Sequence, residues 1–298
     1  MWWHGDGLTM RVICQDVVST EYSNTVVCED GYQLRYRVWP ASGASTGTMI
    51  LVNGMMSHSI WFRELANGLT GLQVDVIGAD RRGSGPNKPD RGDAPSRRML
   101  ISDLCKIIEN EHRGAPIYVV GWCWGALPTV NLALELGAKL SGVVLLAPGL
   151  FPSQPVKRRA QAELLAAENA KLDSAVLRSP LTEEMFSNRI DVQDFIRNDD
   201  LSQRMFTPRF FRITGEMSLI ATARLSQLPQ PLLLLLATND ATIDHDQTIK
   251  AFHRLPSTAL TIGTIPCNHG MQFEAPREVV NHISRWLQQD HGFAAPPS

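Results

Sequence analysis

The sequence predicts an α/β fold: a mostly parallel, twisted sheet with helices on both faces and a helical cap insertion. Three observations lead to this prediction. Short β-branched or leucine-rich runs alternate with segments of helical periodicity. The longest apolar run, "PLLLLLA" at 231–237, has the length of a strand buried on both faces. Between 148 and 228 the strand pattern stops, and helical stretches with aromatic and methionine anchors replace it.

The composition is that of a globular protein that handles a small molecule. Its 298 residues are 44% hydrophobic, which suits one large α/β domain or one domain with an insertion. The formal net charge is -2 with both signs interspersed, so we expect no nucleic-acid partner. No apolar run could cross a bilayer and the start lacks a signal-peptide pattern, so we expect no membrane insertion and a cytoplasmic location.

The cysteines are odd in number and widely spaced, at Cys14, Cys28, Cys105, Cys123 and Cys267. There is no CxxC pair and no metal-ligand spacing. We therefore predict free thiols in a reducing compartment, and neither a metal nor a cofactor. All except Cys123 are interpreted as packing residues.

The elements are expected in a simple order. Residues 25–39 alternate in polarity around an Asp30–Gly31 turn, which predicts an antiparallel hairpin. The alternating part follows, with strands at 48–53, 74–79, 117–121, 142–147, 232–237 and 259–265, and helices near 60–69, 96–111, from about 124, 245–254 and from Pro276. This order divides the chain into an N-terminal extension (1–21), a core in two parts (22–147 and 229–290) and a helical cap (148–228).

The stretch "GWCWG" at 121–125 follows a predicted strand and precedes a predicted helix. Gly121 and Gly125 would let strand and helix approach closely, while the central residue takes a strained conformation that exposes its side chain. A helix amino terminus and an imidazole would both favour the reactive thiolate. Cys123 is therefore the candidate nucleophile, against the alternative of an inert buried thiol.

The partners of such a nucleophile occur later in the chain. His269, in "TIPCNHGMQFEAP" after the last strand, is the candidate base. Asp240 follows the preceding strand and is our choice for the acid, with Asp244 as the alternative. An acyl intermediate also needs two oxyanion donors, for which we predict the backbone N–H groups of Trp124 and Met55.

Residues next to these motifs are candidates for the substrate pocket. The aromatic and methionine anchors of 148–228 are interpreted as the core of the insertion, with the alternative that some of them line an acyl pocket. Pro128 lacks the N–H that would bond the carbonyl of Trp124, so we expect a kink behind the site. The pocket candidates are Asn53, Met56, Trp122, Phe151 and Met271, with Trp122 expected to be packed.

Taken together, these motifs resemble the α/β-hydrolase superfamily, and most of all its lysophospholipase or monoglyceride-lipase-type members. The order nucleophile, acid, base is the one that the superfamily uses. The stretch "ADRRGSGPN" at 79–87 is similar to its turn after the fourth strand, in which Asp80 and Arg82 are expected to hold the loop together. The resemblance covers about residues 22–290 outside the insertion and implies the α/β-hydrolase fold.

The chain departs from the family pattern at the nucleophile, which is usually a serine, and at Asn53–Gly54, where the family has His-Gly. Within the resemblance, cysteine elbows occur in dienelactone hydrolase, polyhydroxyalkanoate synthases and bile-acid acyltransferases. This implies an ester, thioester or lactone of a small hydrophobic substrate, with an acyl carrier as one candidate partner. Hydrolysis, acyl transfer and C–C coupling in natural-product tailoring are the reactions to consider.

Two alternatives stay open. The chain could be a non-catalytic ligand-binding or scaffold protein with a vestigial triad, or Cys123 could act as a weak acid with no covalent step. All three triad positions carry chemically suitable residues, which favours the enzyme. The sequence leaves the substrate and the oligomeric state open.

Overall fold

The computed structural model describes residues 21–169, 176–256 and 259–289. The expected N-terminal extension, apart from Glu21, lies outside these ranges, as do Cys14 and the C-terminal residues 290–298. No helix of the described ranges is long and apolar enough to span a membrane.

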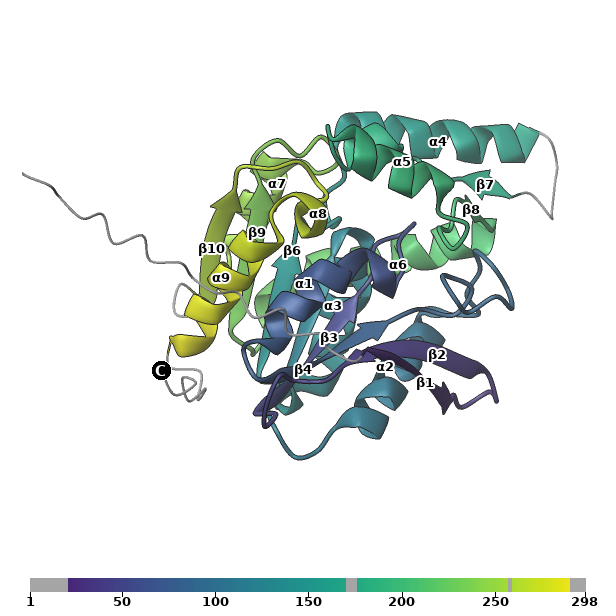
Figure 1. Cartoon of the computed structure of the whole chain (residues 1–298). Helices are drawn as coiled ribbons and strands as arrows, with labels where there is room; N and C mark the ends of the chain where they lie inside the picture. Colours follow the sequence, from purple (N-terminus) through teal and green to yellow (C-terminus); the bar gives the residue numbers. More distant parts are fainter. Residues whose placement is uncertain (1–20, 170–175, 257–258, 290–298) are drawn as a thin grey trace, which may run out of the picture.

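An eight-stranded sheet forms the centre of the molecule, in the order β1-β2-β4-β3-β5-β6-β9-β10 (Figure 1). The β1–β2 and β2–β4 pairings are antiparallel, and the other five pairings are parallel. The strands are β1 (Tyr22–Val27), β2 (Gln33–Trp39), β3 (Gly47–Val52), β4 (Val74–Ala79), β5 (Ile117–Trp122), β6 (Gly142–Leu146), β9 (Leu232–Ala237) and β10 (Leu260–Ile265). The mostly parallel sheet, the hairpin and the α/β class are confirmed.

Helices cover both faces of this sheet. On one face α1 (Arg63–Thr70) packs against α9 (Pro276–Gln288), with the short α8 (Met271–Glu274) beside them. On the other, α2 (Arg97–Glu111) packs against α3 (Ala126–Leu136). Every residue of β3, β5, β6 and β9 is buried, as expected for strands covered on both faces. The remaining elements outside the stretch between β6 and β9 are α7 (His245–Phe252) and the 3-10 turns η1 (Ser59–Phe62), η2 (Cys123–Gly125) and η3 (Gly137–Lys139). The turn η5 (Leu225–Gln227) lies within that stretch.

The chain between β6 and β9 is mainly helical and contributes no strand to the large sheet. In Figure 1, α4 and α5 lie together at the top of the view, while α6 lies below them, next to α3. The long helix α6 contacts both α3 and α2, so this part of the chain is anchored to the body of the molecule. Its elements are α4 (Gln154–Asn169), β7 (Leu177–Arg178), η4 (Glu183–Met185), α5 (Ile190–Asn198), β8 (Met205–Phe206) and α6 (Pro208–Arg224).

A buried polar link also ties this segment to the core. The carboxylate oxygen Oδ2 of Asp199, just after α5, lies 2.8 Å from Nε2 of His58 and accepts a hydrogen bond of 2.6 Å from Nε1 of Trp61. The His58 and Asp199 side chains are 2% and 9% exposed. His58 is therefore a buried structural contact.

Pro128, which was expected to kink the helix behind Cys123, instead lies close to the start of that helix. The chain after Cys123 first makes the 3-10 turn η2, and the α-helix begins only at Ala126. Pro128 thus falls in the first turn of α3, where a backbone N–H has no intrahelical partner to lose. The N–H of Ala126 instead bonds the carbonyls of Cys123 and Trp124.

Candidate active site

Cys123 stands at a sharp turn where β5 passes into η2 and α3. Its φ of 54° lies in the left-handed region, which is costly for a residue with a side chain. A Cβ on Gly121 would come within 2.8 Å of the carbonyl oxygen of Gly125, and one on Gly125 within 2.2 Å of that of Val52. Both glycines are therefore needed for the strand–turn–helix packing, which holds the Cys123 side chain at the carboxyl edge of the sheet.

Asp240 and His269 meet behind this turn. Asp240 follows β9 and His269 follows β10, and since these strands are parallel neighbours, their carboxyl ends lie at the same edge. Nδ1 of His269 is 2.6 Å from Oδ2 of Asp240 and 2.8 Å from Oγ1 of Thr242. The Thr242 hydroxyl donates to the other Asp240 oxygen at 2.7 Å. These two oxygens can both accept from Nδ1 and so favour the tautomer that carries its proton there.

The charges of this pair stabilise each other. Burial lowers the pKa of His269, but the Asp240 carboxylate and the Cys123 sulfur raise it more, so the net shift is upward. Burial raises the pKa of Asp240, but the charge and hydrogen bond of His269 and the bonds from Thr242 lower it more. Nε2 of His269 has no regular hydrogen-bond partner among the residues that the structure describes. This nitrogen is therefore available to exchange a proton with the Cys123 thiol.

Asp244, the alternative acid, bonds the start of α7 and not His269. It caps α7, accepting bonds from the backbone N–H of Gln247 at 3.0 Å and from its side-chain amide at 2.6 Å. It makes no described contact with His269. The geometry thus selects Asp240 as the partner of the histidine.

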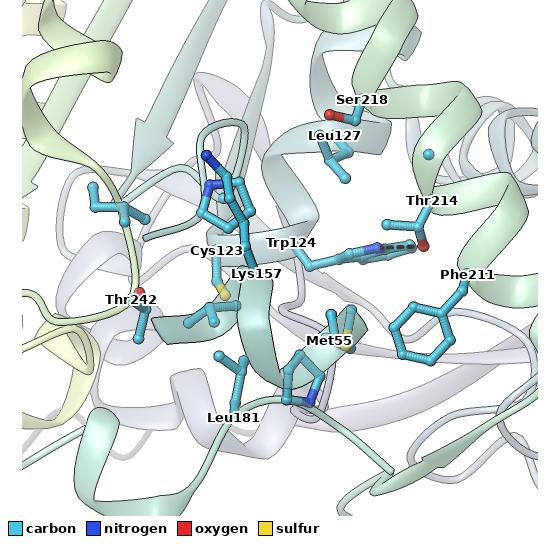
Figure 2. A pocket seen from close by; sticks show the side chains of 17 residues that line it. Met55, Cys123, Trp124, Leu127, Lys157, Leu181, Phe211, Thr214, Ser218 and Thr242 are labelled. Atoms are coloured by element: carbon cyan, nitrogen blue, oxygen red, sulfur yellow. Dashed lines mark hydrogen bonds between the residues drawn. The ribbon is translucent and has the colours of Figure 1, made fainter. Parts of the chain in front are cut away.

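Cys123 opens into an apolar cavity of about 270 Å³ (Figure 2). One side, which we call the strand-end wall, consists of Cys123, Trp124, Gly149 and Thr242, which follow the ends of β5, β6 and β9. The opposite helical wall consists of Lys157 on α4 and Phe211, Thr214 and Ser218 on α6. Figure 2 shows the α6 side chains facing the strand-end wall, with the Trp124 indole bonded to Thr214 between them. Such a cavity suits a hydrophobic small molecule.

Met55 and Trp124, the predicted oxyanion donors, both line this cavity. The N–H of Met55 donates to no acceptor in the described part of the chain. Gly149 lies against the other donor, since a Cβ there would be 3.2 Å from the Trp124 nitrogen and 3.1 Å from the Cys123 carbonyl group. The absence of a side chain at Gly149 therefore keeps the Trp124 amide accessible.

Arg81 supports both donors from behind. Its guanidinium donates to the carbonyl of Gly54 at 3.3 Å and to that of Met55 at 2.9 Å. The first carbonyl belongs to the same peptide group as the Met55 N–H. The guanidinium carbon also lies 5.0 Å from the centre of the Trp124 ring. Burial lowers the pKa of Arg81 to about 9, so it stays charged at neutral pH.

Asp80 and Arg82 were expected to hold their loop together, and both side chains make hydrogen bonds that do so. Asp80 accepts hydrogen bonds from Asn53 and from the N–H and hydroxyl of Ser59. Arg82 bonds both oxygens of Asp103 at 2.6 and 2.7 Å, and also reaches Asp30 in the hairpin turn. These bonds fix the loop from which Arg81 reaches the oxyanion donors.

The five pocket candidates of the sequence analysis do not line the cavity among the residues described, which corrects that expectation. The side-chain amide of Asn53 donates a hydrogen bond to Asp80. Met56 is buried, and its carbonyl accepts a hydrogen bond from the backbone N–H of Gln203. The Trp122 indole donates to the carbonyl of His269 and packs against its ring. Phe151 lines a separate hollow beside α6 and α7, and Met271 is fully buried at the start of α8. Met56 and Trp122 directly adjoin Met55 and Cys123, and successive residues of an extended chain point to opposite sides.

Sequence reasoning missed four residues that contribute to the site: Arg81, Gly149, Lys157 and Thr242. Thr242 had a signal, since it lies two residues after Asp240 in "NDAT". Gly149 also had one, as a glycine just beyond a buried strand. Arg81 and Lys157 had none, because their roles depend on contacts between distant segments.

Comparisons with known proteins agree with this architecture. The family model described as "Serine aminopeptidase, S33" matches residues 43–276. Human monoglyceride lipase is 24% identical over 286 residues, covering 91% of this chain and 93% of that protein. A soluble variant of monoglyceride lipase from Saccharomyces cerevisiae superimposes with a TM-score of 0.78 at 17% identity, covering 91% of this chain and 98% of the other. A monoacylglycerol lipase from Paleococcus ferrophilus superimposes with a TM-score of 0.71 at 22% sequence identity, covering 83% of this chain and 97% of the other. The chain therefore belongs to the S33 serine aminopeptidase family of α/β hydrolases, with a monoglyceride-lipase-like core and a cysteine at the elbow.

Proposed function

We propose that this protein is an enzyme of acyl transfer that acts on an ester, thioester or lactone of a small hydrophobic substrate. Cys123 is the nucleophile, His269 the base and Asp240 the acid that orients it. The observation that carries the proposal is the strained Cys123 at an apolar cavity, with His269 close enough to interact with its sulfur. A strained backbone persists only where its surroundings enforce it, and such sites are often functional.

The reaction starts when His269 accepts the thiol proton at Nε2 and the sulfur attacks the substrate carbonyl carbon. Negative charge then develops on the carbonyl oxygen, where the N–H groups of Met55 and Trp124 stabilise it. Collapse of this intermediate breaks the bond to the leaving oxygen or sulfur, which takes the proton back from His269. Asp240 stabilises the imidazolium that exists between these steps.

The resulting acyl-cysteine is a thioester that a second nucleophile must resolve. Water gives hydrolysis, while an amine, alcohol or carbanion gives acyl transfer or C–C coupling. We propose transfer as well as hydrolysis because thioesters react with amines and carbanions more readily than oxygen esters do. An acyl carrier is one donor of thioesters that the mechanism accepts.

We further propose that residues 148–228 act as a cap over a core formed by 22–147 and 229–290. Lys157, Phe211, Thr214 and Ser218, from this segment, form the helical wall and so would contact the substrate. A reducing, cytoplasmic location fits a thiol nucleophile, and the cysteines of the described ranges are all free.

The proposal is tested by intact mass spectrometry after incubation with p-nitrophenyl esters and acyl N-acetylcysteamine thioesters. We expect one added acyl group on the native protein and none on Cys123→Ala. A 2-monoacylglycerol is a useful further substrate because of the lipases to which the chain is similar. An adduct that persists in Cys123→Ala, or no adduct and no turnover with any ester or thioester, would refute the mechanism.

The other cysteines supply an internal control. Burial raises the pKa of Cys28 and Cys267 to about 12 and that of Cys105 to about 11, so these thiols are protonated at neutral pH. In a Cys14→Ser background we expect limiting iodoacetamide at pH 7 to alkylate Cys123 first, as mapped by peptide mass spectrometry. Alkylation that spares Cys123, together with ligand binding that survives its replacement, would instead support a non-catalytic binding protein.

A further inference from the structure

One cationic side chain lines the otherwise uncharged cavity. Of the 17 residues that form its described lining, Lys157 alone carries a charge. It lies in the first turn of α4 and is partly buried. Within the described ranges its ammonium group has neither an ion-pair partner nor a hydrogen-bond acceptor.

A cation facing an apolar cavity is favourable only if a counter-charge or water compensates it. The protein supplies no such group from the cavity lining. Asp240 bonds the lining residue Thr242 but is itself paired with His269. The amino-terminal end of α4, on which Lys157 stands, adds partial positive charge of the same sign. Water can compensate the half-buried ammonium group while the cavity is empty. A ligand that fills the cavity displaces this water, so a negative charge on the ligand would supply the missing counter-charge.

We propose that Lys157 binds an anionic group of the substrate, so that the enzyme prefers esters or thioesters that carry a carboxylate. The preference for an acid over its neutral isostere then depends on one side chain of the helical wall. The catalytic part of this inference rests on the proposed function, whereas the binding part does not require Cys123 to react.

The neighbouring residue offers a matched control. Arg158 carries the same charge on the same helix, but its side chain is exposed and does not belong to the cavity lining. Replacing either residue by methionine removes one positive charge and leaves a long side chain of similar helix propensity. Any effect of overall charge would therefore appear in both variants.

The first experiment measures binding without chemistry. In the Cys123→Ala background, calorimetry compares the monomethyl ester of octanedioic acid, which is an anion at pH 7, with its neutral dimethyl ester. We expect the acid to bind about tenfold more tightly, as for a hydrogen bond to a charged group. Lys157→Met should abolish this preference, Lys157→Arg should retain part of it, and Arg158→Met should leave it unchanged.

The second experiment locates the anion on the substrate of the native enzyme. One arm compares the N-acetylcysteamine thioester of octanedioic acid with that of its methyl ester, so the charge lies on the acyl chain. The other compares octanoyl thioesters of 3-mercaptopropionate and of its methyl ester, so the charge lies on the leaving group. We expect kcat/KM to favour the acid about tenfold in one arm, and Lys157→Met to remove that preference.

The inference is wrong if acid and neutral probes bind the Cys123→Ala protein equally, or if Arg158→Met changes the preference as much as Lys157→Met does. If both Lys157 variants fail to fold, the affinities of acid and neutral probes are compared at 50 and 500 mM salt without a Lys157 substitution. Because an ion pair weakens with salt, the preference for the acid should be smaller at 500 mM, and a preference that does not change would contradict the inference. If the acid binds through Lys157 but no acyl-cysteine forms, the proposed function fails and this inference stands.

Discussion

The two walls of the cavity are built on different principles. The strand-end wall is set by backbone geometry, with a left-handed Cys123 and a glycine that leaves space for an amide. Behind it, Asp240 and Thr242 hold the histidine. The helical wall consists of side chains from α4 and α6 that line the cavity. This difference indicates that reactivity depends on the first wall and substrate choice on the second.

The largest effect we expect is from Asp240, which holds the histidine behind the strand-end wall. Asp240→Asn should lower kcat by roughly 10²–10⁴-fold, because the amide no longer holds the histidine proton on Nδ1 or stabilises the imidazolium. Asp244→Asn makes the same chemical change at the cap of α7, where asparagine caps equally well, and kcat should stay within about twofold. Steady-state kinetics on both variants checks this, and equal losses would overturn the choice of Asp240.

Alanine substitutions at two glycines that line the cavity, one in each wall, compare the two walls directly. Gly149→Ala should lower kcat by about 10–100-fold, because its Cβ would crowd the Trp124 amide that stabilises the oxyanion. Gly215 lies on α6, and a Cβ there meets no atom within 4 Å. Gly215→Ala should thus change KM more than kcat, while stabilising the helix by up to about 1 kcal/mol. Similar losses of kcat in both variants would show that the walls are not separable.

The support behind the oxyanion donors should matter less than the donors themselves. Arg81→Met removes the bonds to the carbonyls of Gly54 and Met55 but leaves the Met55 N–H in place. We expect kcat to fall about tenfold with little change in KM, because the lost interactions strengthen as charge develops. Arg81→Lys cannot make the forked contact and should not restore the rate. A change confined to KM would contradict this role.

The smallest effect on catalysis is expected from the buried link between core and helical segment. Burial raises the pKa of Asp199, but the hydrogen bonds from His58 and Trp61 lower it more, so the net shift is downward. Its stabilising contribution is therefore complete above the unfolded value near 4, and is lost as the pH falls through the lower folded value. Asp199→Asn should cost about 3 kcal/mol at pH 7.

Urea unfolding of the native protein and of Asp199→Asn, measured between pH 2 and 7, tests this link. The difference in free energy of unfolding should shrink as the pH falls below 4. A difference that stays constant over this range would mean that the Asp199 carboxylate is not the stabilising group.

Much of the strand-end wall could be predicted because its signals are local. The run "YVVGWCWG" predicts strand, turn and helix together, since the glycines and the buried strand act over a few residues. Asp240 and His269 follow from the rule that parallel strands end at one edge. Trp122 and Met56 were poor pocket candidates for a geometric reason, because direct neighbours in an extended chain face opposite sides. The positions of Phe151 and Met271 depend on how distant segments pack.

The amino-acid sequence by itself determined the α/β class, the order of elements, the elbow and the residues able to act as nucleophile, base and acid. These follow from periodicity and turn chemistry, which act over short distances along the chain. Only the tertiary structure decided which aspartate meets the histidine, that Arg81 lies behind the oxyanion donors, and that Lys157 faces the same cavity as Cys123. Such contacts join segments far apart in sequence, and their geometry depends on how the helices pack on the sheet.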